Sequence, residues 1–149
     1  MMLSEIRDEL LAQHEQLRAL AMDALAKADR ARGGGDDGWA ALVESLARLS
    51  AASSAHIVHE ERLLGQVLPT IDAWGERRAA LMDERHRDEH RAIGEALALA
   101  RTHTRRLEVI RLVGDAVRAL RDHMAREEQE ILHEDVLRDD IGAIDSAGG

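Results

Sequence analysis

Apolar residues recur at intervals of three or four positions along most of the chain, and this spacing constrains the fold more than any other feature of the sequence. Side chains at that spacing share one face of a helix. The interruptions are few: a glycine-rich stretch at residues 31–38, a segment at 68–75 that holds the only proline, and a weaker break near 101–106. The pattern predicts four long amphipathic helices, at about residues 3–30, 38–67, 74–102 and 104–134.

Long helices joined by short connections pack as antiparallel neighbours. We therefore expect an all-α protein, an antiparallel up-down-up-down four-helix bundle, with residues 1–149 forming one domain. β-Branched and aromatic residues, which favour strands, are scarce, whereas Ala, Leu, Arg and Glu are abundant. Residues 135–149 end in small residues and glycines, and we expect this tail to be frayed.

The composition excludes several classes of function. With no cysteine, the chain has no disulfides, iron–sulfur clusters or thiol nucleophiles. A net charge of −9 leaves no basic surface for nucleic acid. The first residues have neither the basic nor the apolar region of a signal peptide, and no apolar run approaches the roughly 20 residues of a membrane span. These features predict a cytoplasmic protein that binds neither nucleic acid nor membrane.

Polar residues interrupt each apolar stripe at positions that should face the core. A buried polar side chain without a partner costs a few kcal/mol, so such residues must pair with one another or bind a common ligand. In an antiparallel bundle, a rise of about 1.5 Å per residue places all of them roughly 14–21 Å from the end that holds the N-terminus. The interrupting residues are His14, His56, Glu60, His86, His90, His123 and Glu127.

Imidazoles and carboxylates at this spacing are typical of a metal centre. Residues four apart lie one turn apart on the same helix face, close enough to bind the same ion or adjacent ions. Imidazoles suit borderline metals, and carboxylates can bridge two cations. Seven ligands exceed what one tetrahedral zinc ion needs and fall short of filling two octahedral ions. We therefore expect two ions with bridges and an open position; the residue types alone leave zinc and manganese open beside iron.

Taken in order, these elements resemble the hemerythrin-like family of HHE cation-binding domains. The resemblance spans about residues 8–132 and implies two iron ions inside a hemerythrin-like bundle, with an oxo or hydroxo bridge supplied by solvent. It also implies that Glu60 is a bridging ligand and that the terminal ligands are His14, His56, His86, His90 and His123. The matching segments are LLAQHEQLR around His14, HIVHE at 56–60, HRDEH at 86–90 and HMAREEQEIL at 123–132.

The last helix departs from the oxygen-carrying members of that family, in which an aspartate lies five residues after the histidine. Here Glu127 lies four residues after His123, and Glu128 lies five residues after it. Glu127 continues the stripe through Leu120 and Ile131, so we assign it as the second bridging carboxylate. Glu128 is the alternative.

The resemblance implies three classes of function. The first is binding or sensing of O2 or a related diatomic or peroxide ligand, in a dry pocket lined by Leu10, Leu17, Leu49, Met82, Ile93 and Leu120. The second is a stress-defence enzyme that acts on peroxide or nitric oxide or repairs iron centres. The third is a non-catalytic iron sensor or interaction module. Paired histidines on the third helix resemble the oxygen-binding members, whereas a glutamate on the last helix resembles members with sensing and stress roles. An enzyme would need a redox partner, and a sensor would need a signalling partner.

Overall fold

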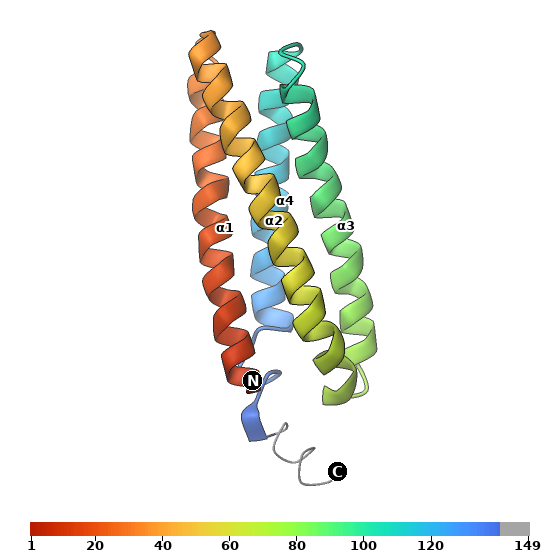
Figure 1. Ribbon diagram of the computed structural model, residues 1–149. Helices are drawn as coiled ribbons and strands as arrows, with labels where there is room; N and C mark the ends of the chain where they lie inside the picture. The colour runs from red at the N-terminus through yellow and green to blue at the C-terminus, as the bar shows by residue number, and fades with distance from the viewer. Residues whose placement is uncertain (141–149) are drawn as a thin grey trace.

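The computed structural model describes residues 1–140 as four helices (Figure 1). Each helix packs against the helices that precede and follow it in the chain, and α1 also packs against α4, which closes the ring. The predicted all-α, up-down-up-down bundle is confirmed. No helix within residues 1–140 is long and apolar enough to cross a membrane. The helices are α1 (Leu3–Ala31), α2 (Asp36–Ile71), α3 (Gly75–Ala100) and α4 (Arg106–Glu130).

Two helix ends differ from the predicted ones by more than two residues. Helix α2 runs through Pro69 to Ile71, beyond the expected end at residue 67. A proline so near the end removes only one helical hydrogen bond, and the Thr70 hydroxyl donates to the nearby Val67 carbonyl at 2.7 Å. Helix α4 ends at Glu130 rather than at residue 134.

The chain after α4 turns back against the bundle. Leu137 is fully buried, and the Asp139 carboxylate accepts hydrogen bonds from the Ser4 backbone N–H at 2.9 Å and the Ser4 hydroxyl at 2.7 Å. Because these contacts anchor residues 135–140 to the start of α1, the prediction of a frayed tail is wrong for that segment. The rest of the predicted tail, residues 141–149, lies outside the described residues.

The turn between α2 and α3 is tight enough to require glycine. A Cβ atom at Gly75 would lie 1.6 Å from the Leu68 carbonyl oxygen, which is backbone and cannot move aside. This close approach makes α3 reverse directly against α2. The turn therefore fixes the relative heights of polar residues on the two helices.

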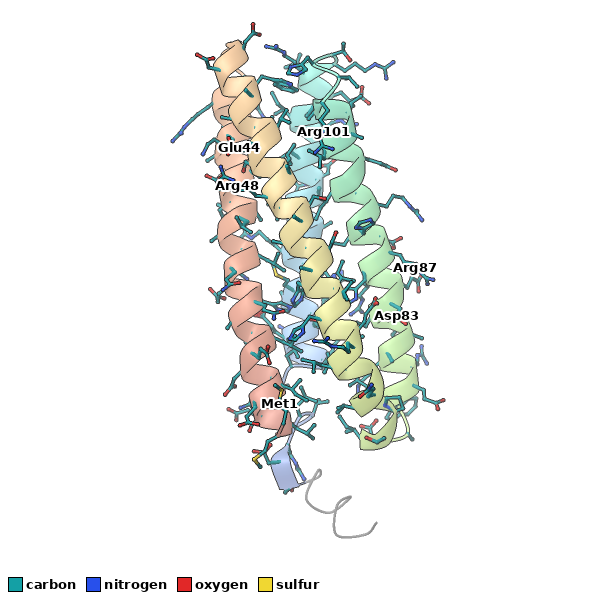
Figure 2. All side chains as sticks on the ribbon, in the orientation of Figure 1. Met1, Glu44, Arg48, Asp83, Arg87 and Arg101 are labelled. Carbon is teal, nitrogen blue, oxygen red and sulfur yellow. The ribbon has the colours of Figure 1, made fainter. Side chains whose placement is uncertain are left out.

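Two apolar clusters fill the core, and the polar residues lie between them. The large cluster occupies the half of the bundle near the α1–α2 and α3–α4 loops and includes Leu17, Trp39, Leu49, Ile93 and Leu120. The small cluster lies at the end holding the N-terminus. Charged side chains such as Glu44, Arg48 and Arg87 lie on the outside (Figure 2). The small cluster consists of Ile6, Leu10, Leu64, Leu68, Met82, Ile131, Leu132 and Leu137.

Candidate metal centre

Six of the seven predicted site residues meet in the layer between the two apolar clusters. All are at most 10 % exposed at the side chain, and every helix contributes at least one of them. Their ligand atoms form two groups, each compact enough to surround one ion, and Glu127 belongs to both groups. The six are His14 on α1, His56 and Glu60 on α2, His86 on α3, and His123 and Glu127 on α4.

The histidines form two pairs. His14 and His56 have ring centroids 5.0 Å apart and join α1 to α2, whereas His86 and His123 have centroids 5.2 Å apart and join α3 to α4. We call these the α1–α2 pair and the α3–α4 pair. In every one of these rings it is Nε2 that approaches the two buried carboxylates.

Glu60 lies between the two histidine pairs and offers one oxygen to each. Its Oε2 atom is 2.8 Å from His56 Nε2 and 3.6 Å from His14 Nε2. Its Oε1 atom is 3.0 Å from His86 Nε2 on the other side. A carboxylate placed in this way is suited to bridging two cations.

Glu127 repeats this arrangement from the opposite side of the layer. Its Oε1 atom is 3.1 Å from His14 Nε2, and its Oε2 atom is 2.9 Å from His123 Nε2 and 3.7 Å from His86 Nε2. Glu128, the alternative, is only partly buried and pairs with Arg18. The structure therefore turns Glu127, not Glu128, toward the histidines.

The polar atoms at the centre fit a cation better than they fit one another. Among the described residues, both oxygens of Glu60 and Oε1 of Glu127 are buried without an aligned hydrogen-bond partner, although imidazole nitrogens lie about 3 Å away. Unsatisfied buried carboxylate oxygens are costly, and a positive ion between them would remove that cost. The residues present thus fit a pair of metal ions, one beside His14, His56 and both carboxylates and the other beside His86, His123 and Glu127.

Charge within the layer shifts its pKa values strongly. Burial disfavours the protonated form of each histidine, but the nearby carboxylates outweigh burial and raise the pKa of His14 and of His123 to about 9. The same balance raises the pKa of His86 to about 11. Burial also disfavours the ionised carboxylates, yet the adjacent histidines hold the pKa of Glu60 and of Glu127 below the usual value. In the metal-free layer, protons on the histidines compensate the carboxylate charges.

His90, the seventh predicted ligand, does not join the layer, so its assignment as a core residue is corrected. It is exposed, and its Nδ1 atom lies 3.3 Å from the hydroxyl of Ser54. The buried stripe of α3 steps from His86 by three residues to Glu89 and then by four to Ile93. Helices have 3.6 residues per turn, so a buried stripe alternates steps of three and four residues. The assignment of His90 assumed a step of four from His86, whereas the buried stripe continues with a step of three.

Glu89 is the residue that sequence reasoning missed. Its side chain is buried and accepts hydrogen bonds from the Ser53 hydroxyl at 2.8 Å and from His123 Nδ1 at 2.7 Å. The apolar residues around it contained the signal, because Met82, His86, Glu89 and Ile93 follow the alternating steps expected of a buried face.

Fold and site together define a four-helix protein with a buried cation-binding centre. The sequence matches the family model described as the hemerythrin HHE cation binding domain over residues 5–134. This match covers most of the chain, and the protein belongs to that family. No individual curated protein and no solved structure gives a significant match.

Proposed function

We propose that this protein holds two iron ions in the buried layer and uses them to bind or sense O2 or a related small ligand. The observation that carries the proposal is the placement of Glu60 and Glu127, each of which offers one oxygen to the α1–α2 pair and the other to the α3–α4 pair. Two ions bridged by two carboxylates account for all six inward-facing residues. A single bound ion would leave one pair of imidazoles without a metal to coordinate.

Iron is the metal that this function requires. The mixed set of imidazoles and carboxylates suits a borderline divalent ion, and affinity order alone does not choose iron over zinc or manganese. A bound pair of iron ions would supply the redox chemistry that O2 binding needs. The protein itself supplies four neutral imidazole donors for only two bridging carboxylates, which favours binding or sensing over oxygenase chemistry.

The surrounding residues restrict what can reach the centre. The apolar clusters lie against the layer from both ends, so bulk water is excluded along the bundle axis. Two shallow depressions approach from the sides. One, of about 360 Å³ between α1 and α2, reaches His56, and the other, of about 420 Å³ between α3 and α4, reaches His123 and Glu89. These approaches and the dry interior favour a small, weakly polar ligand.

The test is a visible spectrum of iron-loaded protein, reduced without air and then exposed to O2, with metal content measured on the same sample. We expect two irons per chain and a charge-transfer band that develops in O2 and bleaches under vacuum. Fewer than two irons per chain would rule out the two-ion centre. Two irons with no reversible band would rule out reversible O2 binding.

One observation favours a second candidate, a stress-defence enzyme that acts on peroxide or nitric oxide. Paired histidines on α3 were the feature that resembled the oxygen-binding members, and exposure of His90 removes it from the layer. The inward-facing Glu127 is the feature that resembled members with stress roles. Catalytic loss of added peroxide or nitric oxide by iron-loaded protein, supported by an electron donor, would favour this candidate over reversible O2 binding.

A further inference from the structure

The histidines of the layer have a second set of partners on their outward-facing nitrogens. In each ring Nε2 faces the buried carboxylates, which leaves Nδ1 to face the outer part of the bundle. A hydrogen bond from Nδ1 fixes which ring nitrogen carries the proton and so leaves Nε2 free to bind a metal. These outer partners differ between the two histidine pairs, although both pairs contact Glu60 and Glu127 on the inner side.

The α3–α4 pair has a carboxylate behind each imidazole. His123 Nδ1 donates to Glu89 Oε2 at 2.7 Å, and His86 Nδ1 donates to Glu61 Oε1 at 3.1 Å. Glu89 is the better held of the two carboxylates, because its other oxygen accepts a hydrogen bond from the buried Ser53 hydroxyl at 2.8 Å. Negative charge behind an imidazole makes its inner nitrogen a stronger donor to a metal.

The α1–α2 pair lacks this charge. His56 Nδ1 donates to the neutral amide oxygen of Gln13 at 2.6 Å. His14 Nδ1 is buried without a hydrogen-bond partner among the described residues, with the nearest Glu128 oxygen 3.8 Å away. Glu128 is also paired with Arg18, which offsets its charge.

We propose that Glu89 is a positioning residue of the metal centre and that, together with Glu61, it makes the α3–α4 position bind its cation more tightly than the α1–α2 position. Glu89 holds the His123 ring with Nε2 facing inward and adds negative charge behind it. This inference rests on the proposed two-ion centre. It also gives Glu89 a reason to be buried, since a buried carboxylate far from the bridging position would otherwise add only a desolvation cost.

The test is a titration of the metal-free full-length protein with Co²⁺ in competition with a chelator, followed by visible absorption. In the wild type we expect two binding steps of unequal affinity. Glu89→Ala removes both the hydrogen bond and the charge, so the tighter step should weaken by about 10- to 100-fold. The weaker step should stay within about threefold of its wild-type value, because Glu89 lies behind the other position.

Two further variants separate positioning from general damage. Glu89→Gln keeps the shape and both hydrogen bonds, since the amide oxygen can accept from His123 and the amide N–H can donate to Ser53. It removes only the charge, so it should weaken the tighter step less than Glu89→Ala. His90→Ala is the matched control: it alters the next residue on α3, which is exposed against Ser54, and should change neither step.

The outcomes are distinct. Equal steps in the wild type, or either Glu89 variant binding like the wild type, would overturn the inference while leaving the two-ion centre intact. Equal weakening of both steps in Glu89→Ala would indicate a loss of general structure and would also overturn it. A wild-type protein that binds fewer than two Co²⁺ ions would instead contradict the proposed two-ion centre, and this inference with it.

Discussion

The large apolar cluster and the polar layer beneath it are stabilised in different ways. The large cluster consists of buried aliphatic side chains and one tryptophan, whose burial stabilises the fold whatever the pH or metal content. The polar layer contains titratable groups that stabilise the fold only while their charges are balanced. The large cluster therefore provides most of the folding stability, whereas the polar layer provides the candidate metal ligands.

The small apolar cluster completes this division at the other end of the layer. It is much smaller than the large cluster, and it recruits the chain after α4, through Ile131, Leu132 and Leu137. The small cluster separates the polar layer from solvent at the end of the bundle that holds the N-terminus. Perturbing the large cluster, the layer and the small cluster in turn should therefore give three distinguishable results.

Among single substitutions, the largest expected effect comes from the large cluster. Trp39 is fully buried, its indole N–H donates to the Ala100 carbonyl at 2.9 Å, and the Arg106 guanidinium lies 5.0 Å from the ring centroid. Trp39→Ala should lower the free energy of unfolding by about 3–5 kcal/mol, measured by urea denaturation followed by circular dichroism. Metal content of the folded protein should not change, since the residue lies far along α2 from the layer.

Trp74 provides the matched control, because it is the only other tryptophan and is 61 % exposed. Trp74→Ala should change the free energy of unfolding by no more than about 0.5 kcal/mol. If fully folded Trp39→Ala protein bound less metal than the wild type, the large cluster would also contribute to metal binding. That result would contradict the assignment of stability to the large cluster and metal binding to the polar layer.

The next effect is a pH dependence confined to the polar layer. The pKa of His14 and of His123 is raised from 6.5 to about 9 in the folded protein. Their contribution to stability is therefore complete below pH 6.5 and is lost as the pH rises through about 9. Each proton that the folded protein retains changes stability by about 1.4 kcal/mol per pH unit, so metal-free protein should lose roughly 3 kcal/mol for each of these histidines over that interval.

The carboxylates give the opposite sign at acid pH. The pKa of Glu60 and of Glu127 lies below its usual value of 4.5, so their contribution is present above that pH and is lost as the pH falls through the lowered values. Denaturation of metal-free protein at a series of pH values measures both limbs. Zinc-loaded protein is the comparison, because bound metal displaces the protons and its affinity should rise with pH. If the stability of the metal-free protein stays constant or rises from pH 6.5 to 9, this explanation is wrong.

A third effect concerns metal binding itself. Glu60→Ala removes one oxygen from each of the two metal positions, and His56→Ala removes an imidazole from the α1–α2 pair. Each variant should lose at least one of two bound ions. Loss of that ion should remove about 2.7 kcal/mol of metal-dependent stabilisation at a free metal concentration 100 times the dissociation constant. Thermal unfolding with and without Zn²⁺ measures this difference.

His59→Ala is the control for that effect. His59 neighbours Glu60 in sequence but faces outward, where it pairs with Glu9 at 2.9 Å and contacts Arg62. Its substitution should leave metal content unchanged. Retention of two ions by both Glu60→Ala and His56→Ala would show that the ions bind elsewhere in the protein.

How much of this was readable from the sequence depends on the length of the pattern involved. Four helices were predictable because each apolar stripe runs for many turns, so errors at single positions do not alter the result. The polar layer was predictable for the same reason, since interruptions in four independent stripes fell at one height. Glu127 was preferred over Glu128 by its phase with Leu120 and Ile131, and the structure places it inward.

Single positions and chain ends were the parts that could not be read. His86 and His90 share a helix face in an ideal turn, but a step of three from His86 to Glu89 fits a buried stripe as well as a step of four to His90. The hydrogen bonds that Glu89 accepts from α2 and α4 decide between the two. The segment after α4 ends in small residues and glycines, so its pattern predicts a frayed tail. Leu137 is held by a long-range contact with the start of the chain, which no local pattern records.

The smallest expected effect tests that contact and, with it, the small cluster. The Asp139 carboxylate caps the first turn of α1 by accepting from the Ser4 N–H and hydroxyl. Removing a cap of this kind costs about 1 kcal/mol, so Asp139→Ala should lower the free energy of unfolding by roughly that amount. Asp140→Ala is the control, because within residues 1–140 Asp140 pairs only with the nearby, exposed Arg138 and should cost less than about 0.5 kcal/mol.

The metal content of Asp139→Ala then shows what the small cluster does for the layer. Leu10 and Met82 lie within one helical turn of His14 and His86, so they cover the layer whether or not the chain after α4 is docked. We therefore expect Asp139→Ala to bind two ions with unchanged affinity. Accelerated metal release to a chelator, at unchanged equilibrium affinity, would instead show that residues 135–140 close a route by which the ions leave.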